Sequence, residues 1–266
     1  KAHKSYLPAY CTWVSLDAWI FVDNEVWFAF RFVLSIRKLM GDEVKNKTLI
    51  DLIRPFGPSI LKCKLPEDLI KDLNQDCLDI SNKKKEKRDW SDQLAGRVEE
   101  EYHISQDVLL KHAHWFNAVT SRYLFPDDTQ FKEQKDNFKI GIASGWYVRQ
   151  YAGDFNPAHY HTGCQISCIG YLKMPEDINE YWEKEDKDHN PFGGYIDFRY
   201  GSIGLNCPNN IKLKPQVGDF YMFPNWLDHQ VYPFKSKYNY PDEKGERRSF
   251  SLNIVFSNVE KDRNKS

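Results

Sequence analysis

Two histidines separated by one residue, His159 and His161, are the first side chains in the sequence with a spacing that suggests chemistry. They end a run that is typical of a β-strand, and alternation along a strand would place both imidazoles on the same side. Two imidazoles on one side can bind a single metal ion. A bare His-x-His pair also occurs as two exposed loop histidines, so it indicates a metal site only when a further ligand is found.

A third histidine, His229, lies downstream in a segment that runs from Gly218 to Pro233. Two further motifs accompany the histidines, Ser-x-x-x-Tyr-Leu over residues 167–172 and Arg-x-Ser-x-x-x-Asn over residues 247–253. The complete order is His-x-His, Ser-x-x-x-Tyr-Leu, Gly-x-x-x-x-Phe-Pro-x-x-x-x-His-x-Val-x-Pro and Arg-x-Ser-x-x-x-Asn. This order of motifs is far more specific than the histidine pair alone.

The ordered set resembles the iron(II)/2-oxoglutarate-dependent oxygenase superfamily, and in particular a prolyl-hydroxylase-like branch found in phages and marine bacteria. The resemblance covers residues 138–256 and extends more loosely back to residue 56. It implies that His159, His161 and His229 are the catalytic metal ligands, which hold Fe(II) and leave positions for 2-oxoglutarate and O2. It also implies that Arg247 binds the distal carboxylate of 2-oxoglutarate and that Ser249 donates its hydroxyl to that carboxylate.

The sequence departs from the usual superfamily pattern at one ligand. Most members have His-x-Asp/Glu, whereas this chain has His161 at the carboxylate position. Three neutral imidazoles leave a formal charge of about +2 on the site instead of about +1, which should strengthen binding of an anionic keto acid. Halide binding on iron needs this coordination position vacated, and an imidazole fills it. We therefore expect hydroxylation of an unknown small-molecule or protein substrate, or a related oxidation, and not halogenation.

Two details of this interpretation have alternatives. Arg248 could replace Arg247 as the carboxylate ligand, although the period of two that relates Arg247 to Ser249 favours Arg247. Arg247 could also form a surface ion pair with Glu246 or Asp242. Asp228 is adjacent to His229, but neighbouring strand residues face opposite sides, so we expect it to cap or to face solvent.

Two other function classes remain as hypotheses. A zinc-dependent hydrolase is one, because zinc also accepts three histidines and an activated water. The His-x-His-x-Asp-His pattern of metallo-β-lactamases is absent, since Thr162, Gly163 and Cys164 follow His161. A non-catalytic cupin-like metal-binding module is the other.

Helical patterns precede the region of these motifs. Pro66, two acidic residues and apolar positions on one face predict a helix from Glu67 to about Ile80. A second helix is expected from Ser105 to Pro126. His112 and His114 lie on it two residues apart, so they point to different faces and should have surface or capping roles.

From residue 138 onward, short β-rich runs alternate with Gly, Pro and Asn. This texture predicts a mainly β fold with flanking helices, with a double-stranded β-helix (jelly-roll or cupin-like) core. Turns at 215–219 and 242–245 are expected to close hairpins. We expect residues 1–55 to form an N-terminal segment of unresolved role, 56–137 a helical layer that supports the core, 138–258 the oxygenase core and 259–266 a polar tail.

Composition excludes several partners and compartments. The formal net charge is -1, so no overall positive field indicates nucleic acid or an anionic membrane. The basic run at 83–88 is expected to be a solvated surface.

The six cysteines are scattered, and we expect reduced thiols, with Cys164 and Cys168 packed in the core. The most apolar stretch, residues 19–40, contains several charges, and no secretory signal is visible, so we expect a cytoplasmic protein without a membrane span.

Overall fold

The structure is a computed structural model that describes residues 50–53, 57–82, 96–98, 100–126, 138–181 and 192–258. The expectations for most of the N-terminal segment, for the basic run at 83–88 and for the polar tail at 259–266 fall outside these ranges. Within them, none of the helices is long and apolar enough to cross a membrane.

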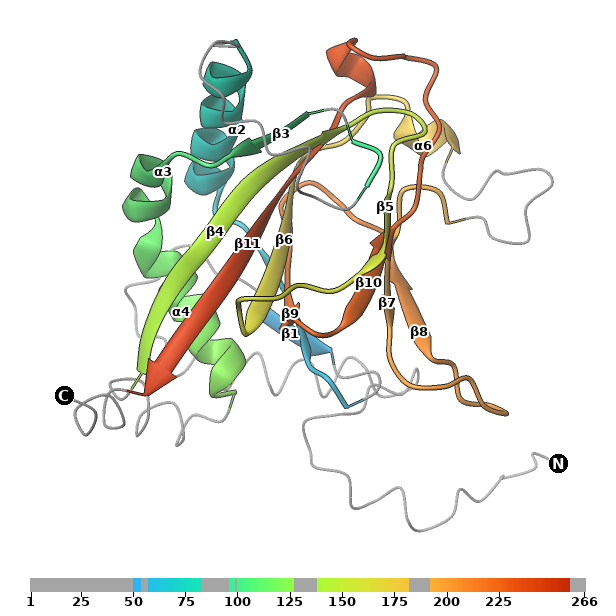
Figure 1. The fold of residues 1–266 in the computed structure, drawn as a ribbon. Coiled ribbons are helices and arrows are strands. Elements are labelled where there is room, and N and C mark those ends of the chain that lie inside the picture. The colour runs from blue at the N-terminus through green and yellow to red at the C-terminus, as the bar shows by residue number, and fades with distance from the viewer. Residues whose placement is uncertain are drawn as a thin grey trace, which may run out of the picture. The chain divides into compact units, whose positions relative to one another are not determined.

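The described strands form two antiparallel sheets (Figure 1). The larger sheet contains, in spatial order, β1 (Ile50–Ile53), β2 (Ile60–Lys64), β9 (Asp219–Pro224), β6 (Ile166–Lys173), β11 (Arg247–Asn258), β4 (Phe138–Gln150) and β3 (Glu100–His103). The smaller sheet contains β5 (Asn156–His159), β10 (Asp228–Val231), β7 (Ile196–Arg199) and β8 (Asn210–Leu213).

The eight strands from β4 to β11 are wound as a jelly roll. In chain order, the first, third, sixth and eighth of them belong to the larger sheet, and the second, fourth, fifth and seventh belong to the smaller one. Two sheets connected in this way form a double-stranded β-helix. The predicted fold class is therefore confirmed, and β1, β2 and β3 extend the larger sheet at its two edges.

Strand alternation separates two cores on the two faces of the larger sheet. In β9, Phe220 and Met222 pack with buried residues of the helices, whereas Tyr221 and Phe223 pack with residues of the smaller sheet. Each face of this strand is thus buried, which explains why its sequence is almost continuously apolar.

The helices pack on the face of the larger sheet that is opposite the smaller sheet (Figure 1). These helices are α2 (Glu67–Asn82), α3 (Gln106–Lys111) and α4 (Ala113–Leu124). A further short helix, α6 (Ile178–Tyr181), follows β6 in the chain. The first of them begins with two acidic residues directly after Pro66, as predicted, and it buries Leu69, Leu73 and Cys77.

The predicted second helix is interrupted at His112. The structure has two helices there, α3 and α4, with His112 between them as the N-cap residue of α4. Of the two expected roles, surface or capping, the surface role is wrong for His112, because the residue is buried at the cap position and its Nε2 atom lies 2.6 Å from Asp72 Oδ2. A tertiary contact to α2 thus fixes the break, which helical periodicity could not reveal.

The two predicted hairpin turns are also wrong. The segment 215–219 connects β8 of the smaller sheet to β9 of the larger sheet, and the segment 242–245 lies between β10 and β11, which also belong to different sheets. Turn residues reverse the chain in both cases, but the strands on either side do not pair with each other.

A buried charge network joins the larger sheet to α2. Glu246 is fully buried and accepts hydrogen bonds from Arg149 Nε at 2.8 Å and from Arg248 Nε and Nη2 at 2.7 Å. Arg149 also binds Glu100, and Arg248 donates to Asn74 of α2 at 2.9 Å. Burial alone would raise the pKa of Glu246, but the hydrogen bonds from the two arginines outweigh it and lower the pKa to about 2.

This lowered pKa predicts an acid-sensitive contribution to stability. A carboxyl group whose pKa is lower in the folded state stabilises the protein above its unfolded pKa, and that stability is lost as the pH falls toward 2. Glu246→Gln leaves the buried Arg248 without a carboxylate and Arg149 with Glu100 alone, so it should reduce the free energy of unfolding at pH 7 by about 3–5 kcal/mol. The difference from the wild type should shrink below pH 4.5, the usual pKa of the group. The free energy of unfolding is measured by urea denaturation over a range of pH, with the exposed Glu243→Gln as the control. Equal losses of stability in the two variants would contradict the prediction.

Candidate active site

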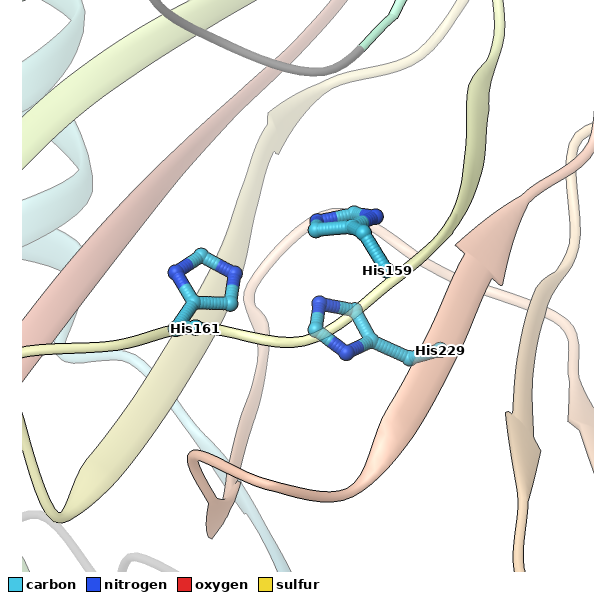
Figure 2. A group of neighbouring side chains, drawn as sticks. All are labelled: His159, His161 and His229. Atoms are coloured by element: carbon cyan, nitrogen blue, oxygen red, sulfur yellow. The ribbon is translucent and has the colours of Figure 1, made fainter.

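Three histidines meet at the edge of the smaller sheet (Figure 2). His229 of β10 is the pairing partner of His159 of β5, and His161 follows two residues later. Their ring centroids lie 4.3 Å (His159–His229), 5.2 Å (His159–His161) and 5.2 Å (His161–His229) apart. One potential ligand atom from each residue lies within 4.8 Å of the others, so a single metal ion could contact all three.

The position of His161 depends on a neighbouring loop and not on strand alternation. The strand β5 ends at His159. The backbone N–H of His161 donates to Asn225 O at 2.9 Å, and Asn225 Nδ2 donates to His161 O at 2.8 Å. Trp146 stacks on the imidazole, with ring centroids 5.8 Å apart. The loop between β9 and β10 therefore turns His161 toward the other two histidines.

Backbone carbonyls fix which nitrogen of two rings faces inward. His159 Nδ1 lies 2.7 Å from Pro157 O, and His229 Nδ1 lies 2.9 Å from Leu227 O. Because a carbonyl oxygen can only accept, Nδ1 carries the hydrogen in both rings and Nε2 keeps a free lone pair. Hydrogen bonds of this kind orient the ligands of many metal sites.

The pKa shifts of His161 and His229 favour neutral imidazoles. Burial and the proximity of His159 lower the pKa of His161 to about 4, against a hydrogen bond to Asn253 that raises it. Burial, with His159, lowers the pKa of His229 well below its usual value. Neutral imidazoles are the form that binds metal, so His161 and His229 have the right protonation state at neutral pH.

The histidines open into a cavity of about 420 Å³. Its walls come from both sheets of the jelly roll and combine apolar and aromatic side chains with polar ones. Among the residues that line it are Glu101, Trp146, Val148, Gln150, Asn156, Tyr160, Tyr171, Phe223, Ser249 and Asn253.

Arg247 lies behind this cavity as a buried cation. Its side chain is 1% exposed, and its guanidinium lies over the Phe234 ring at 4.9 Å. Nε and Nη2 donate to Gln150 Oε1 at 3.1 and 2.6 Å, and Nη1 donates to Gly194 O at 2.7 Å. No carboxylate of the described residues forms an ion pair with it. Burial lowers the pKa of Arg247 to about 10, so the group is still cationic at neutral pH.

The side chains between Arg247 and the cavity suit a carboxylate ligand. Ser249 lines the cavity and pairs across the sheet with Tyr171. The Tyr171 hydroxyl is buried and has no hydrogen-bond partner among the described residues. A buried hydroxyl without a partner is costly, and one carboxylate would satisfy it together with the unpaired cation. Sequence reasoning included Tyr171 in a motif but assigned it no role.

The other candidates of the sequence lie elsewhere. Arg248 points away from the cavity toward Asn74 and Glu246, as strand alternation predicted. Cys168 is buried, Cys164 is half-buried with its sulfur 3.9 Å from Ser167 Oγ, and Asp228 is half-buried outside the histidine group. Among the described cysteines none forms a disulfide.

Comparison with known proteins gives a family match over the strands that build this site. Residues 144–253 match the sequence model of the family described as "Putative 2OG-Fe(II) oxygenase". No curated protein matched the sequence.

Solved structures with similar folds include several enzymes. A Pseudomonas putida prolyl-4-hydroxylase is 12% identical with a TM-score of 0.43, over 74% of this chain and 91% of that chain. A collagen prolyl hydroxylase of Paramecium bursaria Chlorella virus-1, in complex with 2-oxoglutarate, is 15% identical with a TM-score of 0.42, over 73% and 94% of the two chains. HygX from Streptomyces hygroscopicus, with nickel and 2-oxoglutarate bound, is 12% identical with a TM-score of 0.38, over 74% and 82%. At these identities and scores, the likenesses say nothing about which substrate this chain binds.

The histidine group predicts metal binding that fails when one imidazole is removed. His229→Ala takes away the most buried of the three rings and should abolish stoichiometric binding of Fe(II), while the fold stays intact because the sheets do not depend on this ring. Metal content after equilibrium dialysis, with circular dichroism as the check on folding, measures both. The exposed His114→Ala serves as the control. Unchanged iron stoichiometry in His229→Ala would remove the assignment.

Proposed function

We propose that this chain, whose residues 144–253 belong to the 2OG-Fe(II) oxygenase family, hydroxylates its substrate with 2-oxoglutarate and O2 and releases succinate and CO2. The family match confirms the superfamily that the ordered motifs indicated, and with it the use of Fe(II), 2-oxoglutarate and O2. The observation that supports the proposal is that one cavity is lined by the three imidazoles, by the unpartnered Tyr171 hydroxyl, and by Gln150, which binds the buried Arg247.

His159, His161 and His229 would hold the iron. Iron(II) bound there would supply the redox chemistry that puts one oxygen atom of O2 into a substrate C–H bond and the other into succinate, as C1 of 2-oxoglutarate leaves as CO2. The contribution of the chain is orientation, because carbonyl hydrogen bonds fix two rings and the Asn225 loop fixes the third. Three neutral ligands leave the full charge of the metal ion to attract the dianionic keto acid.

Arg247, Tyr171 and Ser249 would bind the distal carboxylate of 2-oxoglutarate. The guanidinium supplies the charge, and the two hydroxyls supply hydrogen bonds from neighbouring strands. Binding of this carboxylate would satisfy the Tyr171 hydroxyl and the Arg247 charge in one step. This pocket favours an oxygenase over a zinc hydrolase or a non-catalytic cupin-like module, because neither of these needs a buried cation beside the metal.

The remaining cavity wall would face the substrate. Trp146, Val148 and Phe223 offer apolar contacts, and Tyr160, which is 64% exposed, stands where the cavity lining reaches the surface. The substrate itself is to be found by assay, and small molecules and peptides are both to be tested.

Succinate formation tests the proposal against both alternatives. Purified protein given Fe(II), 2-oxoglutarate and O2 should form succinate, and His229→Ala should not, because it lacks a metal ligand. Succinate is measured by chromatography, with Zn(II) in place of iron as a second control. A zinc hydrolase or a metal-binding module would form no succinate under any of these conditions, and that result would reject the oxygenase.

Arg247 tests the co-substrate separately from the metal. Arg247→Met keeps much of the side-chain volume and removes the charge, so affinity for 2-oxoglutarate should fall by about 3–5 kcal/mol, or roughly two to three orders of magnitude. Calorimetric titration of the Mn(II)-loaded protein measures the Kd for the keto acid, and the Mn(II) affinity itself should change little. The exposed Arg97→Met is the control. Equal affinities in all three proteins would leave a metal-binding β-barrel without a 2-oxoglutarate site.

A further inference from the structure

We propose that Gln150 is a positioning residue, which orients Arg247 with a neutral amide and thereby reserves the positive charge for the distal carboxylate of the keto acid. The inference rests on the proposed function and adds a residue to it. Gln150 is the last residue of β4, pairs directly with Arg247 of β11 and is 2% exposed. Unlike Arg247, it is among the residues that line the cavity.

The Gln150 amide is held at both ends. Its Oε1 accepts from Arg247 Nε at 3.1 Å and from Nη2 at 2.6 Å, and its Nε2 donates to Asn156 Oδ1 at 2.8 Å. A guanidinium can only donate, so the amide oxygen must be the atom that faces it. Asn156 begins β5, the strand that ends at His159. One amide therefore connects the cation of the carboxylate pocket to the strand that carries a metal ligand.

The described contacts use only part of the guanidinium. Arginine has five N–H donors, and single hydrogen bonds from Nε, Nη1 and Nη2 engage three of them. One N–H on each terminal nitrogen is left to bind a carboxylate oxygen. Gln150 occupies the edge formed by Nε and Nη2, so it fixes the plane of the group.

The neutrality of Gln150 is the second part of the inference. The other two buried arginines of the neighbouring strands, Arg149 and Arg248, both bind the carboxylate of Glu246. Their charges are compensated inside the protein, whereas Arg247 has an amide in the equivalent role. A carboxylate at position 150 could accept the same two hydrogen bonds from Arg247, but it could not donate to Asn156 and it would neutralise the cation. The buried arginines that face the helices thus have carboxylate partners, whereas Arg247 on the cavity side has an amide partner.

Two substitutions separate charge from geometry. Gln150→Glu keeps the shape and the hydrogen bonds from Arg247, loses the one that Gln150 donates to Asn156 and adds a compensating charge, so the Kd for 2-oxoglutarate should rise at least about 100-fold. Gln150→Leu removes the hydrogen bonds without adding charge, and the Kd should rise about tenfold. Calorimetry of the Mn(II)-loaded protein measures both values, and Gln216→Glu, an exposed residue in the turn between β8 and β9, is the charge-matched control.

Two further titrations exclude a general structural effect. The affinity for Mn(II) and the affinity for 2-oxobutyrate, which lacks the second carboxylate, should stay within about threefold of the wild type in Gln150→Glu, because neither involves Arg247. A Gln150→Glu variant that binds 2-oxoglutarate within threefold of the wild type overturns the inference. So does an equal loss for 2-oxoglutarate, 2-oxobutyrate and Mn(II), or an equal loss in Gln150→Glu and Gln150→Leu. If the wild-type protein binds no 2-oxoglutarate, the proposed function fails as well. This outcome distinguishes failure of the proposed function from failure of the inference about Gln150 alone.

Discussion

Side-chain alternation along β11 is the constraint on which the site and the core both depend. Ser249, Ser251 and Asn253 face the cavity, whereas Phe250 and Leu252 pack among the residues that contact the helices. Because β11 lies between β4 and β6, its register is fixed on both sides. A shift by one residue would exchange the two faces and place apolar rings where the carboxylate pocket is.

The same alternation divides the buried charges. On the helical face, Glu246 and Glu100 form ion pairs with the buried Arg149, and Glu246 also pairs with Arg248. On the cavity face, Arg247 donates its hydrogen bonds to neutral groups among the described residues, and the charge of Asp154 acts on it without an ion pair. An uncompensated buried cation is costly, and proteins tolerate such costs mainly at functional sites. This contrast, more than the presence of arginine in the motif, distinguishes a ligand pocket from a structural ion pair.

The metal centre follows a different principle, because its parts come from segments that are far apart in the chain. Pairing of β5 with β10 brings His159 to His229, and the loop after β9 holds His161. None of these contacts is strong alone. Their combination brings one potential ligand atom from each of the three imidazoles within 4.8 Å of the others, which is what a metal ion needs from a preformed site.

The sequence by itself indicated the resemblance to the oxygenase family, the grouping of the three histidines and the orientation of Arg247, not Arg248, toward the cavity side, because these follow from local order and from a period of two. It also predicted α2 correctly, since capping and amphipathic spacing act within one helix. Only the tertiary structure decided that His112 breaks a helix, that Tyr171 has an unpartnered hydroxyl and that Gln150 is the partner of Arg247. Each of these depends on a contact between residues distant in the chain, and local patterns carry no information about which distant atom will be the partner.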